Sequence, residues 1–427
     1  MRTSDWVREE GYVCRTHGLD VPLDYSDPAG QQIQVFAREL RGFRDEVLPC
    51  LVYLQGGPGF EVGRPVSLSA WQKAALEQFN LILLDQRGTG MSTPFESGMG
   101  LEVEAAQLAD YLAHFRADSI VKDAERLRHE LLGVGQKWSV LGQSFGGFCA
   151  LSYLSFAPEG LERVLLTGGV PPIGQGAVAV YEALAPNVHR RTRAMYAQFP
   201  DAVGIVADLR DELLKHEYRL PNGDPLHLER LQSLGIMLGR SCGGSSLYGL
   251  LEMSKARGTD GRLTSRFLHA VERAASVVTN PIYAILHEAI YCEGSASDWA
   301  AQRVKDASRS PEAEEMPLCF DGEMIFPWMF NDLGALKSLQ GAAQILSAKE
   351  DWSALYDTDQ LRVNTVPTAA LVYDEDMYVD RGLSLITMDG VGTSCVWSTN
   401  EYEHDGLRQD GARIFKRLLK MANDLSR

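Results

Sequence analysis

Residues 138–148 contain the side chain with the clearest chemical meaning in this chain. An apolar run that ends at Leu141 leads into Gly142-Gln-Ser144-Phe-Gly146, and a helix-compatible run follows. Glycines around a serine, between a strand and a helix, are typical of a nucleophile elbow, because residues without a Cβ leave room for a strained turn. The amides at the start of the following helix would face an oxyanion formed there. The segment therefore predicts that Ser144 is a nucleophile.

Two further apolar runs upstream also end in glycine-rich loops. Residues 51–59 run into Gly-Gly-Pro-Gly, and residues 80–92 end in Asp-Gln-Arg-Gly-Thr-Gly-Met-Ser. Each run has the pattern of a buried strand. The order along the chain is therefore glycine loop, Asp-Gln-Arg-Gly loop and nucleophile elbow.

With these three motifs the chain resembles the α/β-hydrolase fold. More narrowly, it resembles the prolyl aminopeptidase (proline iminopeptidase) family of serine peptidases. All three hallmarks lie between Gln55 and Gly147, and the resemblance resumes near the C-terminus. It implies an α/β-hydrolase fold, which is a mostly parallel, doubly wound sheet, with an inserted helical lid.

The pattern of the rest of the chain agrees with this fold class. Residues 9–41 predict an antiparallel edge hairpin, and residues 49–169 alternate strands and helices, with one long helix expected over 105–132. Such βαβ alternation implies a mostly parallel sheet. Strand patterns return only at 366–373 and near 384–388.

The intervening block reads as successive helices, which suggests an insertion into the hydrolase core. We therefore expect three parts: residues 1–173 as the first part of the core, 174–341 as the helical lid, and 342–427 as the second part of the core.

Composition restricts the partners of the protein. The 427 residues have a formal net charge of −16, which argues against nucleic acid and against anionic membrane as partners. The N-terminus lacks a signal-peptide apolar region, and no run is long enough to span a bilayer. The seven cysteines form no zinc-like cluster, so we expect free thiols in a cytoplasmic protein. A mechanism that uses a serine nucleophile would need no metal and no cofactor.

A serine nucleophile needs a base, and a histidine oriented by a carboxylate is the usual solution. In this fold the chain order is serine, acid, histidine. Of the nine histidines, only His404 lies beyond the returning strands. We predict that His404 is the base.

The acid should follow the strand that ends near residue 373, where Asp374, Glu375 and Asp376 are adjacent. The resemblance selects Asp376, because the family's acid precedes a methionine and Met377 follows it. Asp374 remains the alternative. Glu375 and the later carboxylates Asp380 and Asp389 are interpreted as solvated loop charges.

The topology predicts that the backbone N–H of Phe145 is one donor of an oxyanion hole. The resemblance implies that Gly57 supplies the second. Many family members have histidine where this chain has Gln55, and this change should alter what supports the loop without removing the backbone donors. Asp85 and Arg87 are expected to hold the loops by hydrogen bonds and charge pairing, without contacting substrate.

An aminopeptidase must bind a free α-ammonium group, and a partly desolvated ammonium requires carboxylates. In the family these come from the lid, and the resemblance implies Glu288 and Glu323, which lie in apolar and aromatic segments. The alternative is that both are ordinary helix-surface glutamates.

Nearby aromatic residues could form a slot for a pyrrolidine ring, and Cys292 could face the same site or belong to the core. The candidate slot residues are Tyr291, Phe320, Phe326 and Trp328.

The residues predict a serine hydrolase with a Ser-His-Asp triad. The resemblance further implies an exopeptidase that releases N-terminal proline, either alone or together with other small residues, from peptides with a free N-terminus. The alternative is another serine hydrolase of the same fold, an esterase or an amidase. Epoxide hydrolases and dehalogenases use aspartate at the elbow, so Ser144 argues against them. A non-catalytic binding protein would require a degraded triad.

Overall fold

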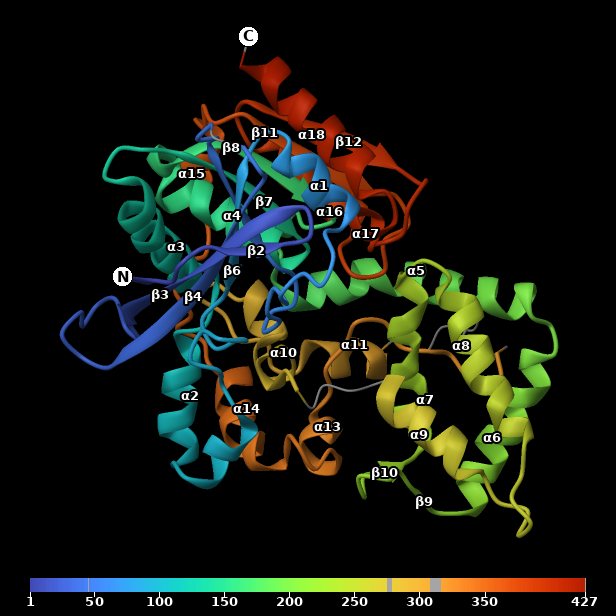
Figure 1. Cartoon of the computed structure of the whole chain (residues 1–427). Coiled ribbons are helices and arrows are strands. Elements are labelled where there is room, and N and C mark those ends of the chain that lie inside the picture. The colour runs from blue at the N-terminus through green and yellow to red at the C-terminus, as the bar shows by residue number, and fades with distance from the viewer. Residues whose placement is uncertain (45, 275–278, 308–315, 427) are drawn as a thin grey trace.

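A ten-stranded, mostly parallel sheet forms the centre of the molecule (Figure 1). The computed structural model describes residues 1–44, 46–274, 279–307 and 316–426. The strand order is β1-β3-β4-β6-β5-β7-β8-β11-β12, with β2 paired to β3. The strands are β1 Arg2–Thr3, β2 Val7–Glu9, β3 Tyr12–Pro22, β4 Gln32–Arg41, β5 Cys50–Leu54, β6 Asn80–Asp85, β7 Trp138–Gln143, β8 Leu161–Thr167, β11 Thr368–Tyr373 and β12 Ser394–Thr399.

The predicted edge hairpin is present as β3 and β4, which pair antiparallel, and β4 pairs antiparallel with β6. From β6 to β12 neighbouring strands are parallel. The chain therefore has the predicted α/β-hydrolase architecture.

Alternate residues of each central strand face opposite sides of the sheet, and each side has its own buried core. In β5, for example, Val52 and Leu54 belong to one core, and Leu51 and Tyr53 belong to the other. Helices α3 (Ala117–Leu132), α4 (Phe145–Phe156) and α15 (Thr358–Arg362) contribute to the first core. Helices α1 (Ala70–Leu76) and α18 (Gly411–Leu425) contribute to the second. The continuous apolar character of these strands follows from burial on both faces.

Two predicted elements differ from the structure. The helix expected over 105–132 is two helices, α2 (Ala105–Ala113) and α3, separated at residues 114–116. The strand expected near 384–388 is the helix α16 (Arg381–Asp389), and the last strand is β12. The side chain of Asp380 accepts a hydrogen bond from the Leu383 amide at 2.8 Å, so it caps a helix in a segment too short for periodicity to decide.

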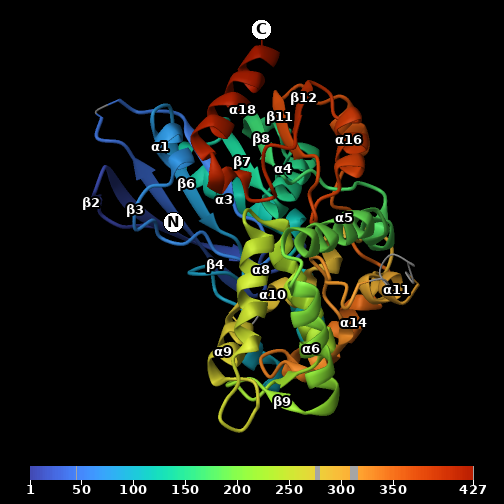
Figure 2. The ribbon, with the colours of Figure 1, turned by 90° about the vertical axis from the view of Figure 1, so that its right-hand side faces the viewer.

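Between β8 and β11 the described chain is helical apart from the short pair β9 (Tyr218–Arg219) and β10 (Pro225–Leu226). Besides α15, the described α-helices are α5 Gly176–Gln198, α6 Ala202–Lys215, α7 Leu228–Ser233, α8 Gly243–Glu252, α9 Ser265–Ala274, α10 Pro281–Leu286, α11 Ala300–Ala307, α13 Pro327–Asp332 and α14 Gln340–Ser347. Most of this insertion lies to one side of the sheet, and α5 runs along the boundary between the two in both ribbon views (Figure 2). The expected end of the insertion at residue 341 falls inside α14, so the helical block continues past it.

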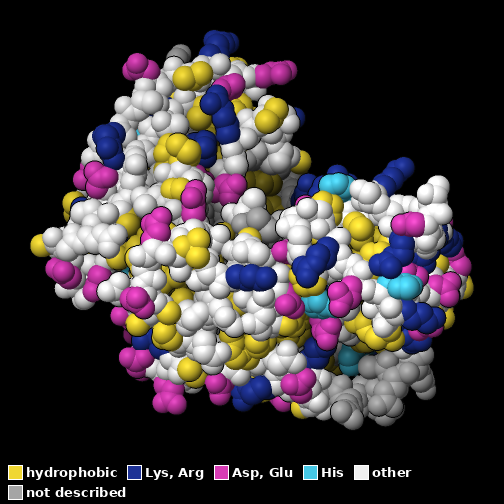
Figure 3. All heavy atoms as spheres, turned by 90° about the horizontal axis from the view of Figure 1, so that it is seen from below, with side chains coloured by type: hydrophobic (Ala, Val, Ile, Leu, Met, Phe, Trp, Pro, Cys, Tyr) yellow, Lys and Arg dark blue, Asp and Glu magenta, His cyan; other side chains and the backbone are white. Residues whose placement is uncertain are grey.

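The side of the molecule formed mainly by the insertion has acidic and basic side chains interspersed with apolar ones (Figure 3). Within the described residues, no helix has both the length and the apolar character that crossing a membrane requires.

Candidate active site

Ser144 lies at a strained turn between β7 and α4, with φ 53° and ψ −126°. The strain is maintained by close backbone packing around it. A Cβ on Gly146 would lie 1.9 Å from the carbonyl oxygen of Leu54, and one on Gly147 would lie 2.1 Å from that of Gly169. Only glycine fits at these two positions, which explains why the serine is surrounded by glycines.

His404 and Asp376 complete a hydrogen-bonded chain with Ser144. The Nε2 of His404 lies 3.0 Å from the serine Oγ, and its Nδ1 lies 2.7 Å from Asp376 Oδ2. Asp376 follows β11 and His404 follows β12, which are neighbouring parallel strands, so their loops meet at the same edge of the sheet. The geometry is that of a nucleophile, a base and an orienting acid.

The three adjacent carboxylates after β11 have different surroundings. Asp376 is 2% exposed, and its Oδ1 accepts hydrogen bonds from the amides of Tyr378 at 2.8 Å and Val379 at 3.2 Å. Asp374 instead pairs with Arg381 at 3.0 Å and contacts Ser398, away from His404. Among these carboxylates, Asp376 is the one hydrogen-bonded to the histidine.

The charges around His404 determine its pKa. Burial lowers this pKa, but the charge and hydrogen bond of Asp376 more than compensate and raise it above its ordinary value. Glu323 raises it further, and Arg240 lowers it. The imidazolium that forms when His404 accepts a proton is therefore stabilised by nearby carboxylates.

The predicted oxyanion loop lies directly against the elbow. A Cβ on Gly56 would lie 2.9 Å from the Cβ of Ser144, and Gly57 has φ 137°, which only glycine adopts readily. Phe145 is the first residue of α4, so its N–H has no partner within the helix. Both predicted donors therefore belong to segments next to the serine.

Gln55, which stands where many family members have histidine, has its own partners. Its side-chain oxygen accepts from the Tyr53 hydroxyl at 2.7 Å, and its carbonyl accepts from Gln86 Nε2 at 3.0 Å. The loop thus remains tied to the following glycine-rich loop through hydrogen bonds of neutral groups.

Asp85 and Arg87 hold loops, but they do so with separate partners. Asp85 accepts from the amides of Val62 at 3.0 Å and Met91 at 3.1 Å. Arg87 forms a buried pair with Asp123 at 2.6 Å and donates to three backbone carbonyls. The charge partner of Arg87 comes from α3, which sequence order alone did not indicate.

Glu288 is buried in the 3-10 helix η5 (Glu288–Tyr291), and its carboxylate has backbone partners. Its two oxygens accept from the amides of Ala300 at 3.1 Å and Ala301 at 2.9 Å, the first residues of α11. Burial raises the pKa of Glu288. The carboxylate therefore caps a helix, a contact that its apolar sequence neighbours did not indicate.

Glu323 is half-buried and has a different partner. Its Oε1 accepts a hydrogen bond from the Tyr283 hydroxyl at 2.8 Å. Its negative charge raises the pKa of His404 and of Tyr378, so Glu323 acts electrostatically on the histidine that is hydrogen-bonded to Ser144. Glu323 is thus an insertion carboxylate that is partly exposed and whose charge acts on His404.

The predicted slot residues do not all come together. The Tyr291 ring lies 5.9 Å from that of Phe148 on the elbow helix. The other three have neighbours inside the insertion: Phe320 lies 6.4 Å from Tyr196, Phe326 lies 4.7 Å from Lys305 Nζ, and Trp328 lies 4.9 Å from His227. Tyr291 is therefore the predicted slot residue that lies beside the elbow helix.

Cys292 is 1% exposed, and its Sγ donates to the carbonyl of Glu288 at 3.4 Å. Burial raises the pKa of its thiol to about 12. Of the two interpretations, the packing corresponds to a core cysteine.

Two tyrosines at the site were not identified from the sequence. The ring of Tyr378 lies edge-on to His404 at 4.7 Å, and Tyr283 binds Glu323 while its ring lies 5.3 Å from that of Phe60, next to the oxyanion loop. Tyr378 follows the acid by two residues, which was an available signal. Nothing in the local sequence marks Tyr283, because α10 reaches the oxyanion loop only through the fold.

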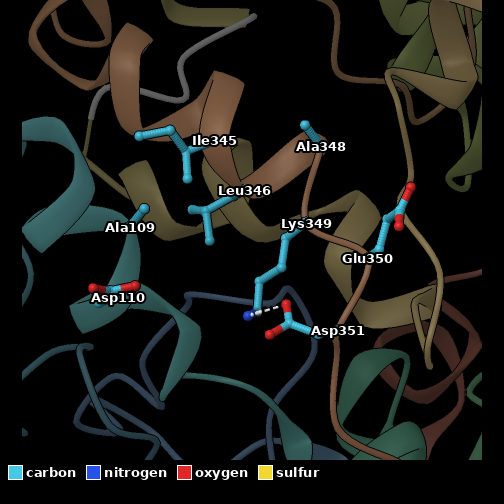
Figure 4. Close-up of a pocket in the computed structure, with 8 residues that line it drawn as sticks. All are labelled: Ala109, Asp110, Ile345, Leu346, Ala348, Lys349, Glu350 and Asp351. Atoms are coloured by element: carbon cyan, nitrogen blue, oxygen red, sulfur yellow. Dashed lines mark hydrogen bonds and ion pairs between the residues drawn. The ribbon is translucent and has the colours of Figure 1, made fainter.

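A small cavity adjoins this aromatic group. Apolar side chains dominate its lining, which consists of Phe148, Val170, Pro172, Val180, Tyr291, Tyr378, Val379, Asp380 and Leu383. A second, open pocket lies between α2 and α14 and contains no triad residue (Figure 4). In the part of the chain that the structure describes, no group of three or more His, Cys, Asp or Glu side chains could hold a metal ion.

Comparison with known proteins places this site in context. Residues 49–211 match the family model described as alpha/beta hydrolase fold. The chain is 48% identical over 419 residues to a proline iminopeptidase of Aeromonas sobria, covering 97% of this chain and 98% of that protein. It is 34% identical over 430 residues to a proline iminopeptidase of Aspergillus aculeatus, covering 96% and 94% of the two chains. A crystal structure of a proline iminopeptidase from Mycobacterium smegmatis aligns with a TM-score of 0.46 at 14% identity, covering 96% of this chain and 98% of that one.

Proposed function

Because the chain belongs to the proline iminopeptidase family of α/β-hydrolases, we propose that it is a serine aminopeptidase that releases N-terminal proline from peptides. The observation that carries the proposal is the hydrogen-bonded chain from Ser144 through His404 to Asp376, together with the half-buried Glu323 whose charge acts on the same histidine. A triad supports acyl transfer, and a nearby carboxylate supports recognition of a cationic amino terminus.

The mechanism begins with attack of the Ser144 Oγ on the carbonyl carbon of the first residue. His404 Nε2 takes the serine proton, and Asp376 holds Nδ1–H and stabilises the imidazolium. The amides of Phe145 and Gly57 stabilise the oxyanion. His404 then gives its proton to the leaving amine, and water, activated by the same histidine, hydrolyses the prolyl-enzyme to free proline and Ser144.

The two glutamates have different parts in this proposal. Glu323 binds the α-ammonium directly, because only one of its oxygens has a protein partner in the described hydrogen bonds and its side chain is partly accessible. Glu288 already accepts two backbone amides and contributes mainly its charge. Phe148, Tyr291 and Tyr378 form the apolar surface for the pyrrolidine ring.

The test compares proline-, alanine- and leucine-arylamides with a small neutral nitrophenyl ester. We expect the parent enzyme to prefer the proline arylamide. A charge-assisted hydrogen bond is worth about 1.5–3 kcal/mol, so Glu323→Gln should lower kcat/KM for the arylamides roughly 10- to 150-fold and leave ester hydrolysis nearly unchanged. Glu288→Gln should have a smaller effect on the arylamides.

The matched control is Glu252→Gln, an exposed glutamate on α8 that forms a pair with Lys255. It should behave as the parent on every substrate. Efficient ester turnover by the parent without arylamide turnover would identify an esterase instead. Equal losses on amine and ester substrates in Glu323→Gln would indicate structural damage, and a larger arylamide loss in Glu288→Gln would exchange the two roles.

A further inference from the structure

The long insertion helix α5 contacts the loops that carry the acid and the base. Asn187 Nδ2 donates to the backbone carbonyl of Asp376 at 2.8 Å. Four residues later, the guanidinium of Arg191 lies 3.4 Å from the carboxylate of Glu375 and also binds the carboxylate of Glu403. Residues four apart lie on the same face of a helix, so one face of α5 makes all these contacts.

The two carboxylates that Arg191 joins immediately precede the catalytic groups. Glu375 is followed by Asp376 at the end of β11, and Glu403 is followed by His404 after β12. Asp376 and His404 lie on separate loops, and their hydrogen bond of 2.7 Å requires a fixed spacing of the two loops. An arginine that binds both loops sets that spacing from outside the sheet.

The carboxylates around Arg191 explain why a positively charged side chain is needed to join the two loops. Burial raises the pKa of Glu403, and the neighbouring Glu375 and Asp376 raise it further, while Arg191 lowers it. Three carboxylates close together repel one another, and Nη2 of Arg191 lies within ion-pair distance of two of them.

A second segment of the insertion also binds the histidine loop. The carbonyl of Gly239 accepts from the amide of His404 at 3.3 Å. The amide and hydroxyl of Ser241 both donate to Asp405 at 2.9 Å. The insertion thus contacts residues 403, 404 and 405, which are His404 and its two neighbours in the sequence.

From these contacts we propose that Arg191 is a positioning residue for the triad. It joins the acid loop to the base loop, so the helical insertion completes the catalytic geometry in addition to covering the site. This inference rests on the proposed serine mechanism, but not on the preference for proline or for an amine.

The experiment uses Arg191→Gln in the full chain and measures kcat and KM on the proline arylamide and on the neutral nitrophenyl ester. A displacement of about 1 Å in a catalytic group can cost roughly a hundredfold, so we expect kcat to fall roughly ten- to a hundredfold on both substrates. KM should stay near that of the parent. Arg191→Lys, which keeps the positive charge but has a shorter reach and a compact ammonium group, should recover part of the loss.

The matched control is Arg210→Gln on α6, an arginine of the insertion that pairs with Asp211 and contacts no catalytic loop in the described hydrogen bonds. It should retain the parent kcat. Thermal unfolding of each variant separates a local change from loss of the fold. If Arg191→Gln is unstable, Glu403→Gln removes the same link from the other side and should show the same kcat loss.

A double variant tests the link itself. If Arg191 and Glu403 act as one unit, Arg191→Gln with Glu403→Gln should lose little more than either single variant. A kcat within about twofold of the parent, a loss confined to KM, or single losses that multiply in the double variant would overturn the proposal. Failure of the serine mechanism would appear separately, as activity retained by Ser144→Ala.

Discussion

The loops at the edge of the sheet and the helical insertion hold their functional groups by different kinds of contact. Around Ser144 the contacts are between backbone atoms, and a Cβ on Gly146 or Gly147 would lie 1.9–2.1 Å from a carbonyl oxygen. In the insertion, Glu288, Glu323 and Arg191 are held by hydrogen bonds of their side chains. Changes in the first region should therefore impair every reaction of the enzyme. In the insertion the effect should depend on the contact that is lost: loss of Glu323 should act on amine substrates, loss of Arg191 on both substrate classes, and loss of Glu288 mainly on stability.

The largest effect is expected at the nucleophile. Ser144→Ala should lower arylamidase and esterase activity by roughly three to six orders of magnitude, the scale seen when a triad member is lost. The protein should remain folded, because alanine has a Cβ as serine has and the glycine contacts are unchanged. Circular dichroism beside the kinetic assay checks both points. Activity above a few per cent of the parent value would exclude a serine mechanism.

The next largest effect on activity is expected at the acid, Asp376. Asp376→Asn should lower kcat roughly ten-thousandfold on amide and ester alike, because His404 loses the carboxylate that fixes its tautomer. Asp374→Asn is the matched control, since Asp374 pairs with Arg381 and should cost little activity. Steady-state kinetics of the two purified variants decides between them, and the opposite ranking would transfer the role to Asp374.

Glu288→Ala tests the insertion through stability. It leaves two buried amides at the start of α11 without their acceptors, so the free energy of unfolding should fall by about 1–3 kcal/mol. Glu288→Gln keeps one acceptor oxygen and should lose less. Urea unfolding followed by fluorescence measures both variants. Equal stability of Glu288→Ala and the parent would mean that the capping contact contributes nothing.

The smallest effect is a change in the pH dependence of ester hydrolysis. Free His404 must be neutral to act as a base, so kcat/KM falls as the pH drops below its pKa. Glu323 raises that pKa, so Glu323→Gln should move the acidic limb to lower pH. Arg240 lowers the pKa, and Arg240→Gln should move the limb to higher pH. Coincident profiles for all three proteins would mean that the insertion exerts no field on the base.

Local sequence signals were enough to predict the fold class, the elbow and the chain order of the expected nucleophile, acid and base. The glycines around Ser144 indicate a turn in which the backbone packs too closely for any residue with a Cβ. The chain order leaves His404 as the single histidine after the returning strands. These signals are local, so they can be read without knowing which segments meet. The short segment 381–389 was assigned wrongly because its apolar residues suit a strand or a helix, and the cap of Asp380 decides for the helix.

The partners of the insertion side chains could be identified only from the folded structure. Glu288 and Glu323 lie in similar sequence surroundings. However, Glu288 accepts hydrogen bonds from two amides of α11, and Glu323 accepts one from the hydroxyl of Tyr283. The link from Arg191 to both catalytic loops joins residues separated by 184 and 212 positions. A carboxylate or guanidinium can bind any suitable partner within reach, and which partner is within reach depends on how distant segments pack.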